Sequence, residues 1–397
     1  MRVLMVVRLF YPWIGGTERQ AHKLALAIHQ RNVDVQIVTG RWFRGTRRTE
    51  LLDGVPVFRN HTLWEFFGVR GLRKLGGYLY IVSLLWHLWR RRDTYDVIHV
   101  HGLNYHTFAA VLAGRRLGKP VVTKVANSGP ASDIKKMRED RQLALARFML
   151  PTALTCDRFV ALNRDVISEL TEAGVPTSRI VELPNGVETG LVRRTDYSLH
   201  DPARVLYVGR LHAQKGLDTL LHAFASLLAQ TDQPCTLRLV GEGPARQQLV
   251  TLAGRLGIAQ RVDFVGRRDD VARQLEHADV FVLPSRAEGL SNALLEAMAC
   301  GVPPVVSDIA GNREVVRHRR TGLAVAMDDP AALAAALREA LEDRELREEL
   351  GTAARRSAEQ TYGLDGVAER YIALYRSLLA ATVPTSVTAV ESERTTA

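Results

Sequence analysis

Two glutamates, Glu288 and Glu296, are separated by seven residues in the segment 284–306, which joins one strand-like stretch to the next. The segment starts as a loop and continues as a helix, for which Ser291 is a suitable N-cap. The loop and first-turn residues, whose amides favour a phosphate, are Gly289, Leu290, Ser291 and Asn292. A carboxylate at Glu296 can accept hydrogen bonds from a ribose diol, and Glu288 can reach a cleft from the loop. Together they fit the two ends of an activated sugar, although singly they also fit a satisfied helix glutamate and a solvated loop charge.

A second group of candidate residues follows the strand-like residues "RVLYV" (204–208), where "GRLHAQKG" places Arg210 and Lys215 on either side of a turn. Gly216 then opens the helical stretch "LDTLLHAFASLL". Two cations at the mouth of a helix N-terminus suit a diphosphate, which the free amides and the helix dipole also favour. Taken alone, the turn fits a surface loop with two solvated charges equally well.

Strand-like runs alternate with amphipathic helical stretches along most of the chain. The expected strands are 2–7, 33–39, 96–101, 120–125, 158–162 and 179–184 in the first half, and 204–210, 235–241, 261–266, 279–284 and 302–307 in the second. Near-continuous apolar strands between helices indicate parallel sheets covered on both faces. We therefore expect an α/β protein of two doubly wound domains, 1–186 and 187–362, facing each other. Ligands of such sheets bind beyond the carboxyl ends of the strands, which places the site in the cleft between the domains.

Length and cysteine content limit the class of protein. The chain has 397 residues, enough for two domains, and only three cysteines, which lack a metal-binding spacing. Arg8 interrupts the short apolar stretch at the N-terminus, so that stretch does not resemble a signal peptide. The uncharged stretch 75–89 is shorter than a membrane-spanning helix requires. These features predict a cytosolic protein.

Positive charge is concentrated in the first half of the chain. Residues 1–185 hold 28 Lys and Arg against 15 Asp and Glu, whereas residues 186–397 hold 25 against 28. A basic half indicates an anionic partner, or else a solvated basic surface without one. The sequence shows no helix-turn-helix, zinc-finger or aromatic RNA-binding signature. A membrane or a phosphorylated substrate is therefore favoured over nucleic acid.

Several segments taken together resemble one known family. They are the Glu-x7-Glu pair with "EAMACG" within 266–322, the turn "GRLHAQKG", "LPNGVE" (183–188), "YPWIGGTER" (11–19) and "DVIHVHG" (96–102). These motifs resemble the family 4 glycosyltransferases, which are retaining enzymes that use nucleotide sugars. The resemblance covers roughly residues 1–380, and it implies two facing Rossmann-like domains with a donor and acceptor cleft between them, the GT-B arrangement.

The resemblance also implies a role for each matching residue. Arg210 and Lys215 would neutralise the leaving diphosphate, an electrostatic contribution on which such a transfer depends strongly. Glu296 would bind the ribose, and Glu288 would bind the hydroxyls of the donor sugar with help from the amides of 289–292. His101, at the end of its strand, would lie beside the transferred sugar, although a lone histidine is more often structural.

Gly15 and Gly16 would allow a phosphate or an acceptor to approach the backbone closely, and a tight turn before a helix is the alternative. Two positions depart from the family pattern. Gly311–Asn312 replaces a double glycine, and the segment "TKVANSG" replaces a strand end that usually carries a histidine. Lys124 and Asn127 of that segment are therefore expected to reshape the acceptor or donor-sugar pocket. No D-x-D motif is present and two cations already serve the diphosphate, so neither a metal ion nor another cofactor is expected.

The expected reaction is transfer of a sugar from a UDP- or GDP-sugar to a glycan or lipid-linked acceptor, as in bacterial surface polysaccharide or glycolipid synthesis. The segment 70–92 carries aromatic residues between two groups of cations, which is typical of an interfacial helix on an anionic membrane. This predicts a cytoplasmic protein at the inner face of the plasma membrane. The alternative is a core helix of the first domain with cations at its ends.

Two other classes of protein stay open as alternatives. One is a different enzyme on the same fold, such as a sugar-nucleotide epimerase or a sugar-phosphate synthase. The other is a non-catalytic protein that binds nucleotide sugars. The presence of both cations and both glutamates favours the transferase over the second alternative.

The end of the chain has two expected parts. Residues 363–381 have apolar positions at helical spacing, and the resemblance implies that this helix crosses back and packs on the first domain. Residues 382–397 are rich in Thr, Ser and Glu and are expected to be disordered.

Overall fold

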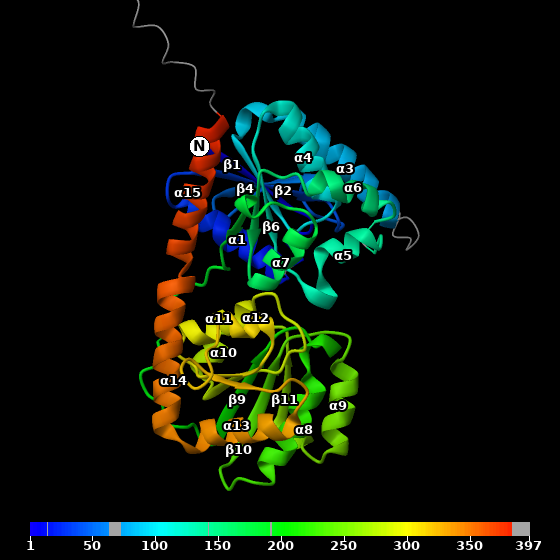
Figure 1. The fold of residues 1–397 in the computed structure, drawn as a ribbon. Helices are drawn as coiled ribbons and strands as arrows, with labels where there is room; N and C mark the ends of the chain where they lie inside the picture. The colour runs from blue at the N-terminus through cyan, green and yellow to red at the C-terminus, as the bar shows by residue number, and fades with distance from the viewer. Residues whose placement is uncertain (14, 63–72, 142, 191–192, 383–397) are drawn as a thin grey trace, which may run out of the picture.

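Two α/β domains form the molecule, one above the other in Figure 1, and each has a sheet with helices on both faces. The computed structural model describes residues 1–13, 15–62, 73–141, 143–190 and 193–382. The tail that the sequence predicts to be disordered lies outside the described residues, except for Thr382, which ends the last helix.

The N-terminal sheet has eight strands in the order β3-β4-β2-β1-β5-β6-β7-β8. The strands are β1 (Arg2–Val7), β2 (Asp34–Gly40), β3 (Thr49–Leu52), β4 (Val55–Asn60), β5 (Val97–His101), β6 (Val121–Val125), β7 (Arg158–Ala161) and β8 (Ile180–Glu182). The helices are α1 (Gly16–His29), α3 (Arg73–Arg90), α4 (Tyr105–Leu117), α5 (Asp133–Arg138), α6 (Ala146–Ala153) and α7 (Arg164–Glu172). Every strand pair is parallel except β3 with β4.

The C-terminal sheet has six parallel strands in the order β11-β10-β9-β12-β13-β14. The strands are β9 (Ala203–Val208), β10 (Cys235–Val240), β11 (Val262–Gly266), β12 (Val280–Leu283), β13 (Pro304–Ser307) and β14 (Leu323–Val325). The helices are α8 (Leu217–Leu228), α9 (Arg246–Arg255), α10 (Val271–Glu276), α11 (Asn292–Ala299), α12 (Ala310–Arg313), α13 (Pro330–Glu342), α14 (Arg344–Ser357), a π-helical turn (Ala358–Tyr362) and α15 (Leu364–Thr382). The strand order reverses at β9, which puts the loops after β9 and β12 at the ligand-binding point of such a sheet.

The antiparallel hairpin β3–β4 is absent from the strands expected above. Its turn residues Asp53 and Gly54 have φ angles of 49° and 87°. An Asp-Gly pair with both residues in the left-handed region is a strong signal for a two-residue hairpin turn. The hairpin was therefore readable from the sequence, whereas β14, with three residues, is too short to give a clear pattern.

Helix α3 separates two groups of apolar side chains. Its buried side chains are Tyr80, Ile81, Leu84 and Leu88, which belong to the core of the N-terminal domain. Its exposed apolar side chains are Leu75, Val82, Trp86 and Trp89. Helical spacing puts these two groups on opposite faces, so the expectation of a core helix holds for one face only. None of the described helices is both long and apolar enough to span a lipid bilayer.

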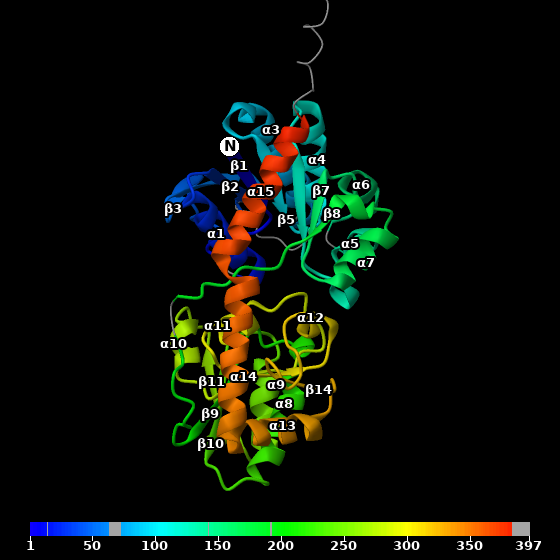
Figure 2. The ribbon, with the colours of Figure 1, turned by 60° about the vertical axis from the view of Figure 1, so that its left-hand side comes forward.

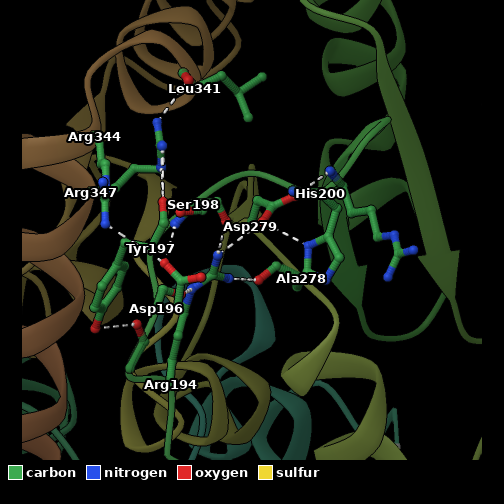
Figure 3. Close-up of polar contacts among 12 residues, drawn as sticks. Arg194, Asp196, Tyr197, Ser198, His200, Ala278, Asp279, Leu341, Arg344 and Arg347 are labelled. Carbon is green, nitrogen blue, oxygen red and sulfur yellow. Dashed lines mark hydrogen bonds and ion pairs between the residues drawn. The ribbon is translucent and has the colours of Figure 1, made fainter.

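The segment between the domains, of which residues 183–190 and 193–202 are described, is fixed to the C-terminal domain by buried polar contacts (Figure 3). Asp279 is fully buried, and its Oδ1 lies 2.9 Å from both Arg194 Nη2 and His200 Nδ1. Arg347 of α14 donates to the carbonyl oxygen of Tyr197 at 2.9 Å. Because a buried charge needs a partner or hydrogen bonds, these contacts hold the segment firmly against the second domain.

Helices α14 and α15 run one after the other along both domains, as Figure 2 shows. Tyr371 and Tyr375 of α15 are fully buried in the N-terminal domain, where the Tyr375 hydroxyl lies 2.7 Å from Nδ1 of His99. Arg31, in the turn after α1, forms an ion pair with Asp365 at 2.6 Å. The last helix therefore packs on the first domain and connects the two domains a second time.

Lys124 of β6 lies beneath α15 with only 5 % of its surface exposed. Its Nζ is 5.8 Å from the centre of the Tyr371 ring, and no carboxylate of the described residues forms an ion pair with it. Burial lowers the pKa of Lys124 to about 7, because the charged ammonium loses its hydration. Burial, followed by the charge of Lys124, lowers the pKa of neighbouring His99 to about 3.

Lys124→Met should therefore stabilise the protein in a pH-dependent way. Between the folded pKa and the higher unfolded pKa, the unfolded chain holds a proton that the folded chain has lost, so wild-type stability rises with pH through this contribution. The gain in unfolding free energy from the substitution should be larger near pH 6 than near pH 9, by about 2 kcal/mol. Urea unfolding at both pH values measures it, and an equal gain at both would contradict a depressed pKa at this position.

Candidate active site

The loop between β12 and α11 touches the N-terminal domain directly. A Cβ atom on Gly289 would lie 2.0 Å from the carbonyl oxygen of Ala126, so only glycine allows this approach. Asn163, which follows β7, donates from Nδ2 to the carbonyl oxygen of Gly289 at 2.8 Å. The two domains therefore meet at this loop, where the carboxyl ends of both sheets face each other.

Helix α11 begins where the sequence predicts. Ser291 is its N-cap, and the Ser291 hydroxyl accepts a hydrogen bond from the Leu294 amide. Asn292 donates to the carbonyl oxygen of Gly16 at 3.1 Å and accepts from Nδ2 of Asn185 at 2.8 Å. The start of α11 is thus joined both to the glycine pair at the start of α1 and to the segment between the domains. The side chain of Leu290 is buried in the core of the C-terminal domain.

Glu288 and Lys215 form an ion pair at the carboxyl end of the second sheet. The distance from Lys215 Nζ to Glu288 Oε1 is 2.5 Å, and the Ser285 hydroxyl donates to the same oxygen at 2.6 Å. Only 8 % of the Glu288 side chain and 16 % of the Lys215 side chain are exposed. One of the expected diphosphate-binding cations therefore contacts the expected sugar-binding carboxylate.

Glu296 lies within α11 and forms an ion pair with a cation from the other domain. Lys23 Nζ of α1 is 3.1 Å from Glu296 Oε1 and 3.5 Å from Oε2 of Glu188. Lys23, Glu188 and Glu296 line a cavity of about 550 Å³ between α1, α10 and α11. A cavity of this size accommodates a small ligand, although Lys215, Glu288 and Arg210 are not among its lining residues.

Arg210 is exposed and lies two residues after the end of β9. Gly15 donates its amide hydrogen to Oε2 of Glu18 at 3.0 Å. Burial raises the pKa of Glu18, and the opposing effects include the charges of Arg8 and Arg210. The acidic side chain of Glu18 therefore lies close enough to Arg210 to feel its charge across the domain boundary.

His101 and Lys124 lie side by side at the ends of β5 and β6, beneath α15. His101 is 3 % exposed, its ring centre is 4.2 Å from that of His99, and neither ring nitrogen has a hydrogen-bond partner among the described residues. Burial, together with the charges of His99 and Lys124, lowers the pKa of His101 well below its usual value. Asn127 is half-buried and donates to Asp133 at 3.1 Å. The structure thus groups His101 with Lys124, and neither lines the cavity around Glu296.

Gly311, the glycine that remains where the family has a double glycine, lies against the backbone of Glu288. A Cβ atom on Gly311 would lie 2.4 Å from the carbonyl oxygen of Glu288, so the glycine itself is required here. Asn312 is 1 % exposed and donates to the carbonyl oxygen of Ser307 at 2.8 Å. Its side chain therefore stabilises the loop from inside the domain.

Lys23 and Asn163 are the site residues that the motifs did not reveal. Asn163 directly follows the strand-like run "RFVAL", so its place at a strand end was a usable signal. Lys23 follows Gly16 at helical spacing, but only the packing of α1 against α11 shows what that helix face contacts. Within the described part of the chain, no group of three or more His, Cys, Asp or Glu side chains is arranged to hold a metal ion.

Comparisons with known proteins agree with this architecture. The family model described as Glycosyltransferase Family 4 matches residues 14–191, and the model described as Glycosyl transferases group 1 matches residues 194–357. The glycogen synthase of Mycobacterium tuberculosis is 30 % identical over 415 residues, which cover 94 % of each chain.

Solved structures share the fold at lower identity. Sucrose-phosphate synthase from Thermosynechococcus elongatus superposes with a TM-score of 0.79 at 22 % identity, over 96 % of this chain and all of that one. The Anabaena protein HepE, in complex with UDP-glucose, superposes with a TM-score of 0.74 at 19 % identity, over 95 % of this chain and all of that one. With two facing parallel-sheet domains, both family models matched and a relative aligned over nearly its whole length, this chain belongs to the family 4, group 1 glycosyltransferases and has the GT-B fold.

Proposed function

We propose that this enzyme transfers a sugar from a UDP- or GDP-sugar to a glycan or lipid-linked acceptor with retention of configuration. The observation that carries the proposal is the buried contact of Lys215 with Glu288 at the carboxyl end of the second sheet. A donor would exchange these partners: its diphosphate would pair with Lys215 and Arg210, and its sugar hydroxyls would bind Glu288. Lys215 would stay paired with a negative charge, and Glu288 would keep hydrogen-bond donors, as buried charges require. The complex of HepE with UDP-glucose supports a nucleotide-sugar donor.

The proposed chemistry breaks the bond between the anomeric carbon and the diphosphate and forms a bond from that carbon to an acceptor hydroxyl. Negative charge that develops on the leaving diphosphate is stabilised by Arg210 and Lys215, so the proposal needs no metal ion. The hydroxyl attacks on the face that the diphosphate leaves, and a diphosphate oxygen takes its proton. Glu296 binds the ribose in this scheme, and His101 becomes a substrate contact only if its ring is uncovered by binding.

We further propose that the acceptor is presented at the cytoplasmic face of a membrane. The exposed apolar face of α3 consists of Leu75, Val82, Trp86 and Trp89. At its end, Arg90 and Arg92 are exposed, and the guanidinium of Arg92 lies 5.4 Å from the centre of the Trp89 ring. Tryptophans beside cations suit the headgroup region of an anionic leaflet. Arg70, one of the cations expected before the aromatic run, lies outside the described residues.

Arg210→Ala and Lys215→Ala should each weaken nucleoside diphosphate binding and lower kcat/KM. A charge-assisted hydrogen bond contributes about 1.5–3 kcal/mol, so an effect of about tenfold or more is expected from each. Calorimetric titration with UDP and GDP, and initial rates with the donor so identified, measure it. Unchanged binding and turnover in both variants would remove the diphosphate assignment.

Glu288→Gln and Glu296→Gln should separate the two ends of the donor. Glu288→Gln should lower kcat more than it weakens binding of free UDP or GDP, because the free nucleotide lacks the sugar. Glu296→Gln should weaken binding of the free nucleotide itself by about tenfold. The reverse order of effects would mean that the donor lies in the opposite orientation.

The protein should float with vesicles that contain phosphatidylglycerol and less with vesicles of phosphatidylcholine alone, and moderate salt should reduce the difference. Replacing Trp86 and Trp89 by Ser should lower the bound fraction by about tenfold. Met327→Ser is the matched control, because Met327 is an exposed apolar residue of the other domain. Equal recovery in the soluble fraction under all conditions would favour a soluble acceptor.

A further inference from the structure

One face of α1 is directed at the C-terminal domain and the segment that leads to it. The carbonyl oxygen of Gly16 accepts from Asn292, and Gln20 donates to the carbonyl oxygen of Gly186 at 2.9 Å. Lys23 continues the same face, because residues four and three apart lie above one another on a helix. Each of these contacts joins the first domain to residues beyond its sheet.

Lys23 holds two carboxylates that belong to different parts of the chain. Its Nζ lies 3.1 Å from Oε1 of Glu296 on α11 and 3.5 Å from Oε2 of Glu188 in the segment between the domains. The side chains of Lys23 and Glu296 are only 19 % and 16 % exposed, so solvent screens this contact less than a surface ion pair. No described residue donates a hydrogen bond to the other oxygen of Glu296, Oε2.

This arrangement divides the Glu296 carboxylate between two partners. One oxygen is held by Lys23, and the other is left for a ligand in the cavity of about 550 Å³ that both residues line. A carboxylate with one oxygen anchored keeps its orientation before the ligand arrives, which reduces the entropic cost of binding. The anchoring group comes from the N-terminal domain, whereas the carboxylate belongs to the C-terminal domain.

We propose that Lys23 is a positioning residue for the donor ribose: it holds Glu296 oriented toward the ribose hydroxyls and joins the nucleotide-binding surface to the N-terminal domain. This inference rests on the ribose-binding role proposed for Glu296. Lys23 itself does not touch the nucleotide in this scheme, so its effect passes through Glu296 and disappears when that carboxylate is removed.

The test compares wild type, Lys23→Met, Lys23→Arg, Glu296→Gln and the Lys23→Met/Glu296→Gln double variant. Calorimetry with UDP, GDP and their 2′,3′-dideoxy forms gives Kd for each. Lys23→Met should weaken binding of whichever nucleotide the wild type binds by about tenfold. It should leave binding of the dideoxy form unchanged within about twofold, because that ligand lacks the hydroxyls that Glu296 would bind. Lys23→Arg should restore most of the affinity, and the double variant should bind no more weakly than Glu296→Gln alone.

Arg31→Met is the matched control, because Arg31 also joins the first domain to a later segment by an ion pair, at 2.6 Å to Asp365. Arg31 lies in the turn after α1 and does not line the cavity. The Kd of this control variant should equal that of the wild type, and thermal unfolding of each variant without nucleotide checks that it is folded. Equal loss of affinity for the natural and dideoxy nucleotides, or additive losses in the double variant, would overturn the positioning role. Wild-type affinity in Lys23→Met would overturn it too and leave the proposed function standing. Failure of the wild type to bind either UDP or GDP would instead overturn the proposed function, and this inference with it.

Discussion

A carboxylate that is largely withdrawn from water is stable only beside a cation or several hydrogen-bond donors. The loop and helix after β12 carry two such carboxylates, and each is paired: Glu288 with Lys215 of its own domain, and Glu296 with Lys23 of the other. The same requirement explains why these side chains can serve a charged ligand. In the proposed function a donor would take over the contacts between Lys215 and Glu288, whereas Lys23 would stay on Glu296 and leave the other carboxylate oxygen to the ligand.

The two domains that carry the site are connected in two places, by the segment between them and by α15. Asp279 and Arg347 fix the segment between the domains to the second domain, and α15 returns to the first domain with Tyr371 and Tyr375 buried there. Between these connections, the backbone of Gly289 lies against the carbonyl oxygen of Ala126. The two domains are therefore joined through the chain twice and are also in contact at this loop.

Helix α3 shows how one element can have two surfaces of different use. Tyr80 and Leu88 are buried in the core of the first domain, whereas Trp86 and Trp89 are exposed on the opposite face of the helix. The sequence offered a core helix and an interfacial helix as alternatives because composition does not separate the faces of a helix that is apolar nearly all round. Packing against the neighbouring helix and the sheet decided which side chains were left outside.

Local signals in the sequence were enough for the architecture and for the chemical type of the site. Strand and helix periodicity predicted two parallel-sheet domains, because periodicity depends on residues close in the chain. The family motifs are short stretches of sequence, and the family they indicated agrees with the comparisons. The N-cap role of Ser291 was also local. The partners of Glu288 and Glu296, the burial of His101 and Lys124 beneath α15, and the contact of Asn163 with Gly289 were decided only by tertiary structure. Each of these joins residues from segments that are distant in sequence, and side-chain pairing across such distances is set by how the domains pack rather than by any spacing along the chain.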